Sequence, residues 1–157
     1  MIVIWFSFIN CFHCSLTFFL FRIIFVASKE VGLAKAFHVK KRIRAVFNVI
    51  KLCNNHEHHG MMTVGKKRWW VNNMKHVALK MFDVDGNVVL LCNHGRSRSP
   101  MYLVAYLVII YGMEPSNALA MVSKILFESR RELLDRHECL VPIIHFISND
   151  KYDLFKC

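Results

Sequence analysis

Residues 86–100 read Gly86-Asn87-Val88-Val89-Leu90-Leu91-Cys92-Asn93-His94-Gly95-Arg96-Ser97-Arg98-Ser99-Pro100, and the rest of the chain is best interpreted from this stretch outward. Its four consecutive apolar residues, 88–91, are typical of a short buried strand, and the apolar run at residues 101–111 predicts a buried helix. The polar residues between them therefore form a loop that leads from the end of a strand to the start of a helix.

A loop of this kind favours an anion. Its backbone N–H groups turn inward, and the helix N-terminus adds partial positive charge. Gly95 allows the turn. Arg98 follows Cys92 after five intervening residues, and its guanidinium can hold two phosphate oxygens. The same field lowers the pKa of a thiol at its centre. We therefore expect Cys92 to be a thiolate near neutral pH and a nucleophile toward a bound phosphoryl group.

Residues 92–99 match the signature Cys-x-x-Gly-x-x-Arg-Ser/Thr, and here the sequence resembles the Cys-x5-Arg phosphatases and, within them, the dual-specificity protein tyrosine phosphatases. Residues 43–49 resemble the family's I-x-x-V-x-N-V strand, residues 24–28 its first strand, and the segments 99–113 and 118–124 its helices after the loop. The likeness covers residues 22–147. It implies an α/β domain in three layers, with a small, mainly parallel central sheet flanked by helices.

The resemblance also implies roles for single residues. Cys92 takes the place of the nucleophile, Arg98 that of the phosphate-binding arginine, and Ser99 that of the hydroxyl that eases loss of the thiolate from the phosphocysteine. The implied phosphate-binding residues are Asn93, His94, Gly95, Arg96, Ser97 and Arg98. The implied activity is hydrolysis of phosphotyrosine and phosphoserine/threonine in proteins through a phosphocysteine intermediate, with no metal and no cofactor.

Two positions depart from the family pattern. Leu91 stands where the family usually has His before the nucleophile, and no Asp precedes Asp83, whereas the family's general acid is an Asp well before the Cys. An ungapped count back to the place of that acid reaches Gly60. Asp83 and Asp85 are separated from Cys92 by a strand, so we do not expect them to replace the acid.

Glu57, His58 and His59 lie near the expected place of the acid, and either residue type can protonate a leaving oxygen. A solvated loop without a catalytic role is the alternative. Without an acid, the chain would be a slow enzyme or a pseudophosphatase that binds phosphorylated partners. The basic residues His94 and Arg96 also leave open a phosphoinositide phosphatase, and the Cys-x-His-Gly pattern resembles RNA 5′-triphosphatases, although that branch normally has Thr-Gly after the arginine.

Composition bears on partners and location. The chain has 157 residues, enough for one domain with a real core. Its formal net charge of +10 favours acidic partners, which are phosphoproteins, anionic lipid headgroups or nucleic acid, and charge alone does not choose between them. We expect a phosphorylated protein substrate or an anionic lipid rather than nucleic acid. Residues 1–21 are nearly all apolar, and the Lys and Arg residues follow them. A helix over this segment would anchor the domain on the cytoplasmic side of a membrane. A cleaved signal peptide and a buried extension are the alternatives. The six cysteines show no disulfide-framework spacing, which agrees with a reducing compartment.

Other segments are assigned by local patterns. Residues 28–37 begin like a helix with Ser28 as its cap, and residues 43–50 are typical of a strand. Residues 66–82 carry apolar side chains at helical spacing, at Trp70, Met74, Val77, Ala78 and Met81. Another helix is expected from Glu114-Pro115, and residues 148–157 form a C-terminal tail.

Overall fold

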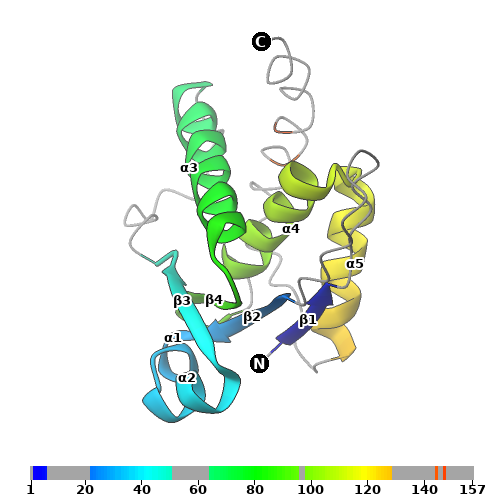
Figure 1. The fold of residues 1–157 in the computed structure, drawn as a ribbon. Helices are drawn as coiled ribbons and strands as arrows, with labels where there is room; N and C mark the ends of the chain where they lie inside the picture. The colour runs from blue at the N-terminus through cyan, green and yellow to red at the C-terminus, as the bar shows by residue number, and fades with distance from the viewer. Residues whose placement is uncertain are drawn as a thin grey trace, which may run out of the picture.

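The computed structural model describes residues 2–6, 22–50, 64–95 and 98–128, together with Ile144 and Ile147. In these parts of the chain the elements are β1 (Ile2–Phe6), β2 (Arg22–Ser28), α1 (Lys29–Gly32), α2 (Lys35–Lys41), β3 (Ile43–Asn48), α3 (Val64–Asp83), β4 (Asn87–Cys92), α4 (Arg98–Tyr111) and α5 (Pro115–Glu128) (Figure 1).

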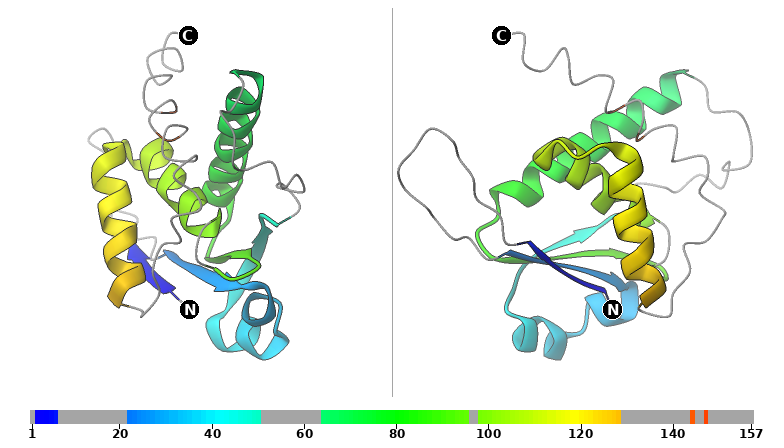
Figure 2. Two further views of the ribbon diagram at one scale, coloured as in Figure 1. Left: turned by 180° about the vertical axis from the view of Figure 1, so that it is seen from behind. Right: turned by 90° about the vertical axis from the view of Figure 1, so that its right-hand side faces the viewer.

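The strands form one sheet in the order β1-β2-β4-β3. β4 pairs in parallel with both β2 and β3, and β1 pairs antiparallel with β2 at the edge. Helices α3 and α4 cover one face of the sheet, with α5 against α4, whereas α1 and α2 lie on the other face (Figure 2). The predicted three-layer α/β fold with a small, mainly parallel sheet is confirmed.

The central strands alternate between two cores because successive side chains of a strand point to opposite faces. Val88, Leu90 and Cys92 of β4 belong to the large core under α3 and α4, while Val89 belongs to a small core beneath α2. Parallel strands are normally covered on both faces. The continuous apolar run that predicted this strand is therefore explained by burial on both sides.

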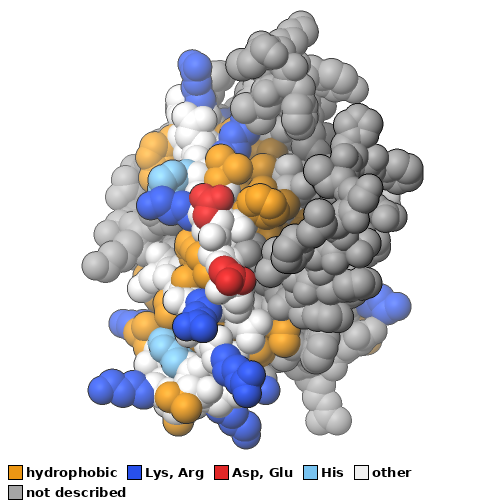
Figure 3. All heavy atoms as spheres, in the orientation of Figure 1, with side chains coloured by type: hydrophobic (Ala, Val, Ile, Leu, Met, Phe, Trp, Pro, Cys, Tyr) orange, Lys and Arg blue, Asp and Glu red, His pale blue; other side chains and the backbone are white. Residues whose placement is uncertain are grey.

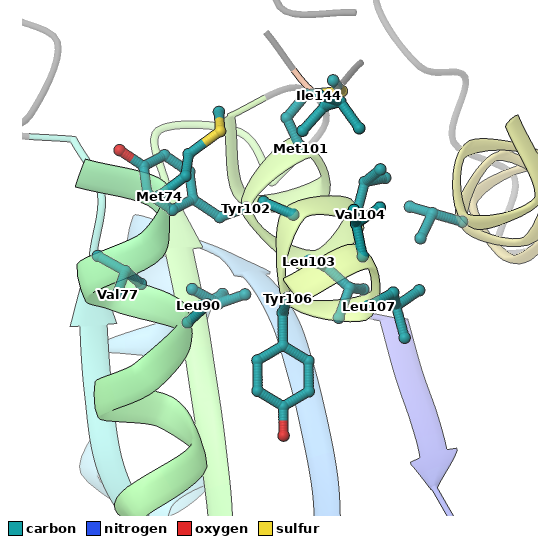
Figure 4. Close-up of a cluster of buried hydrophobic side chains, with 14 of the residues drawn as sticks. Met74, Val77, Leu90, Met101, Tyr102, Leu103, Val104, Tyr106, Leu107 and Ile144 are labelled. Carbon is teal, nitrogen blue, oxygen red and sulfur yellow. The ribbon is translucent and has the colours of Figure 1, made fainter. Parts of the chain in front are cut away.

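The large core is centred on α4, whose residues 99–108 are all buried (Figure 4). The five apolar positions predicted for the long helix lie in α3 and are buried against it: Trp70, Met74, Val77, Ala78 and Met81. Ile144 and Ile147 complete the same core. The helical spacing noted in the sequence thus identified the packing face of α3 correctly.

The helix expected from Ser28 is two short helices instead of one. Ser28 has an extended backbone before α1, but its side chain makes no capping hydrogen bond. Gly32 lies against the Leu91 side chain, where an added Cβ would stand 3.0 Å from the Leu91 Cβ. The chain then turns at Leu33, and Ala34 is again extended as the N-cap of α2. The close packing on Leu91 at the end of α1 sets the place of the break.

The prediction of a helix over residues 1–21 is wrong for its first part, because Ile2–Phe6 forms strand β1 and pairs with β2 from Arg22 to Val26. Apolar residues without charge satisfy a buried strand as well as a helix, and pairing with β2 decides between them. Among the helices that the structure describes, none is long and apolar enough to cross a membrane. Residues 7–21 and the tail at 148–157 lie outside the described residues, and the membrane anchor stays a prediction.

Asn87 fixes the amino end of β4 to both neighbouring layers. Its Oδ1 accepts a hydrogen bond from the Ile23 backbone N–H at 3.2 Å, and its Nδ2 donates one to the Lys41 carbonyl at 2.8 Å. The start of β2 and the end of α2 are thereby held together at the end of the sheet opposite Cys92.

We expect Leu103→Ala to lower the free energy of unfolding by about 2–5 kcal/mol, because Leu103 is fully buried in α4 and its loss leaves a cavity. Leu79→Ala is the matched control, since Leu79 is also helical but 53% exposed, and should change stability by less than about 0.5 kcal/mol. Denaturant unfolding of both variants measures the difference. Equal effects would contradict the placement of α4 at the centre of the core.

Candidate phosphate-binding site

The carboxyl ends of β2 and β4 lie side by side, with Ser28 and Cys92 as register partners. After β2 the chain leaves to the face of α1 and α2, and after β4 it leaves to the opposite face, where α4 lies (Figure 2). In open α/β sheets, ligands bind at the carboxyl ends of two neighbouring strands whose connections leave to opposite faces. The topology thus places the candidate site at the loop after Cys92.

Cys92 is the last residue of β4 and is only 3% exposed. The Gly95 backbone N–H donates a hydrogen bond to its Sγ at 3.2 Å. The loop therefore curls back toward the sulfur, as the sequence predicted. An N–H donor aimed at sulfur stabilises a thiolate, and the same inward-facing donors suit a phosphate oxygen.

Gly95 is required at its position for two reasons. Its φ is +66°, a conformation that residues with a Cβ rarely adopt. A Cβ there would also stand 2.8 Å from the Ala27 carbonyl carbon and 3.0 Å from the Ser28 backbone nitrogen. The loop can thus pack directly on the backbone at the end of β2 only if residue 95 has no side chain.

Helix α4 begins at Arg98, as expected, so the loop ends at a helix N-terminus. Arg98 is half-buried, and Ser99 is fully buried, with its Oγ lacking a hydrogen-bond partner in the part of the chain that the structure describes. A buried hydroxyl without a partner costs about 1–3 kcal/mol. Ser99 is therefore a candidate for a role other than stability.

The remaining loop residues are placed only in part. Asn93 and His94 are exposed, and the Asn93 carbonyl accepts a hydrogen bond from the Lys29 backbone N–H at 3.4 Å. The sequence did not predict this hydrogen bond from α1 to the loop. The only pattern that pointed to it was the pair Ala27-Ser28 at the end of β2. Arg96 and Ser97, which were also predicted to bind phosphate, lie outside the described residues.

The general acid is not located. Its sequence candidates Glu57, His58 and His59 lie outside the described residues. Asp83 and Asp85 are near the amino end of β4, as expected, and Cys92 is at its carboxyl end. Neither aspartate is therefore placed to serve the loop. Across the described ranges there is no group of three His, Cys, Asp or Glu residues arranged to hold a metal ion.

Comparison with solved structures identifies the fold. Human DUSP28 aligns with a TM-score of 0.56 and 14% identity, over 83% of this chain and 94% of DUSP28. PTPMT1 aligns with a TM-score of 0.52 and 16% identity, over 84% of this chain and 94% of PTPMT1. The chain has the fold of the dual-specificity phosphatases.

A mouse protein assigned to the dual-specificity phosphatases and crystallised with zinc tungstate is similar to the same degree, with a TM-score of 0.56 and 14% identity over 85% of this chain and 86% of the mouse chain. No protein-family model matches the sequence, and no curated protein is significantly similar to it in sequence. The likeness is therefore carried by the backbone arrangement of the dual-specificity-phosphatase fold.

We expect Gly95→Ala to destabilise the protein by about 1–3 kcal/mol, because it imposes backbone strain and a contact with Ala27 at once. It should also abolish any rise in melting temperature caused by inorganic phosphate. Gly65→Ala in α3 is the control, since no atom of the described residues lies within 4 Å of an added Cβ and Ala favours a helix. Thermal unfolding with and without phosphate tests both, and a Gly95→Ala protein as stable as Gly65→Ala would contradict the described loop.

Proposed function

We propose that this protein is a cysteine-dependent phosphatase that hydrolyses phosphate monoesters, acting on phosphotyrosine and phosphoserine/threonine in proteins. One observation carries the proposal: the Gly95 N–H donates to the Cys92 Sγ in a loop that ends at the N-terminus of α4. A nucleophile and a cradle for phosphate oxygens are thereby supplied by one segment of eight residues. The dual-specificity-phosphatase fold supports it at a coarse level.

In the first step, the Cys92 thiolate attacks phosphorus, a P–S bond forms, and the P–O bond to the leaving group breaks. The loop amides and the Arg98 guanidinium stabilise the charge on the non-bridging oxygens. The leaving oxygen then takes a proton from an acid or from water. With an activated leaving group, that proton contributes little, so this step depends mainly on the loop.

In the second step, water attacks phosphorus, the P–S bond breaks, and inorganic phosphate leaves. The Cys92 sulfur returns to the thiolate, which a hydrogen-bond donor stabilises as it forms. Ser99 is the residue we assign to this task, because its hydroxyl is buried without a partner among the described residues. The phosphocysteine would then be hydrolysed more slowly without it.

A phosphoinositide is the second substrate class that an observation favours. PTPMT1 has been solved in complex with PI(5)P, and it aligns with a TM-score of 0.50 over 83% of this chain. The loop after Cys92 carries two additional basic residues, His94 and Arg96. A binding-only protein is the remaining alternative, since no acid is assigned. We place the activity in the cytoplasm. Because Ile2–Phe6 belongs to the sheet, the proposed membrane anchor is limited to residues 7–21.

We expect the purified chain to hydrolyse an activated aryl phosphate and Cys92→Ser to lose this activity entirely. If no acid is present, unactivated phosphopeptides or phosphoinositides should react about 10²–10⁴-fold more slowly than in an enzyme with one. A steady-state assay across leaving groups of different pKa measures both effects. Aryl phosphate turnover that survives in Cys92→Ser would exclude Cys92 as the nucleophile, and no turnover by the folded wild type would leave the binding-only alternative.

We expect Ser99→Ala not to destabilise the protein and to raise its free energy of unfolding by up to about 1–3 kcal/mol, because it removes a buried hydroxyl that has no partner among the described residues. Steady-state turnover should fall on the order of 10²-fold, preceded by a burst of released alcohol as the phosphocysteine accumulates. Ser123→Ala is the control, because Ser123 is half-buried on α5, and it should show neither the fall in turnover nor the burst. Slow turnover of Ser99→Ala without a burst would place Ser99 in the first step instead.

A further inference from the structure

Residues 29–44 carry half of the net charge of the chain. This segment, which comprises α1, α2 and the start of β3, holds the six cations Lys29, Lys35, Lys40, Lys41, Arg42 and Arg44. Its only carboxylate is Glu30, so its net charge is five of the +10 of the whole chain. Lys and Arg side chains gather at the end of the molecule formed by α1 and α2 (Figure 3). We call this the α1–α2 surface.

Aliphatic side chains are exposed among these cations. Val31 is 38% exposed, Leu33 48% and Val39 79%. Helix α2 has no fully buried residue and holds to the sheet mainly through Phe37, whose ring packs edge-on against Phe25 at 5.5 Å. The inner side of this layer is thus occupied by the sheet, while its outer side presents lysines and aliphatic groups to solvent.

We propose that the α1–α2 surface docks on an anionic lipid bilayer. Exposed aliphatic groups can enter the headgroup region while the lysines around them extend toward anionic headgroups, which is how interfacial helices bind. An acidic protein fits less well, because Lys is depleted in protein interfaces. A nucleic acid fits less well because no exposed residue within 29–44 is aromatic, and stacking on bases needs such rings.

The α1–α2 surface borders the candidate phosphate site. Lys29 is the first residue of α1, and its backbone N–H donates to the Asn93 carbonyl of the loop at 3.4 Å. A bilayer bound here would thus lie next to the loop after Cys92. The inference concerns binding alone and holds whether or not Cys92 turns over a substrate.

The test compares two variants of the surface with matched controls in the full-length chain. Lys35→Gln with Lys40→Gln removes two exposed cations, and Val39→Ser removes the most exposed aliphatic group. Lys41 and Arg44 are kept, because the Lys41 ammonium lies 5.9 Å from the centre of the Phe25 ring and the Arg44 side chain occupies the space beside Gly86, 2.8 Å from where a Cβ would stand. The controls, on α3 and α5, are Lys80→Gln with Lys124→Gln, and Leu79→Ser.

Binding is measured by co-sedimentation with phosphatidylcholine vesicles, with and without phosphatidylserine. The ratio of the partition coefficients for the two vesicle types measures the contribution of the anionic lipid, because any insertion of the N-terminal segment contributes to both. Each cation near an anionic surface strengthens binding by about fivefold, so the double Lys variant should lower the ratio by about 25-fold. Val39→Ser should weaken binding to the anionic vesicles on the order of tenfold. The controls should match the wild type, and circular dichroism checks that every variant is folded.

Three results would overturn the proposal. The wild type could bind both vesicle types equally, or the double Lys variant could keep the ratio of its control. In the third, the wild type binds soluble polyglutamate or RNA as tightly as it binds anionic vesicles. If this binding is lost in the double Lys variant and unchanged in Val39→Ser, the surface binds an acidic macromolecule instead of a bilayer. None of these measurements depends on phosphatase activity. Failure of the proposed phosphatase function would appear only in the aryl phosphate assay.

Discussion

β4 is the strand on which the other elements depend. It is hydrogen-bonded in parallel on both sides, and its residues 88–91 are fully buried. A parallel strand in this position needs cover on both faces, which α3 and α4 supply on one side and α1 and α2 on the other. Since the connections after β2 and β4 then leave to opposite faces, the loop after Cys92 lies at the carboxyl ends of the strands, where ligands bind in open α/β sheets.

The sequence predicted most of what local patterns encode. A continuous apolar run, a glycine in the loop and an apolar helix identified β4, the Cys92 loop and α4, and they led directly to the Cys92–Gly95 geometry. The remaining features are long-range. Residues 2–6 form a strand because they pair with β2, whereas their apolar composition alone is equally consistent with a helix. The approach of Gly95 to Ala27 and the break between α1 and α2 depend on packing across the sheet, which spacing within one segment does not report.

The chemistry of such a site divides between segments. The proposed nucleophile, the proposed donors to phosphate oxygens and the helix N-terminus all belong to one continuous stretch, residues 92–99, and Gly95 packs this stretch against the end of β2. Asp83 and Asp85 are at the other end of β4, so a general acid, where the protein has one, belongs to another segment. Phosphate binding and attack by sulfur can therefore persist without the acid, and the dependence of the rate on the leaving group is where its loss would appear.

The segment at residues 27–29 serves two parts of the molecule at once. Ala27 and Ser28 form the backbone against which Gly95 packs, and Lys29 both bonds to Asn93 and begins the α1–α2 surface. That layer is held at its other end by the bond from Asn87 to the Lys41 carbonyl, and internally by the bond from the His38 Nε2 to the Gly32 carbonyl at 2.6 Å. A layer fixed at both ends of the sheet cannot tilt freely against it. Whatever binds its outer side therefore also sets the orientation of the Cys92 loop.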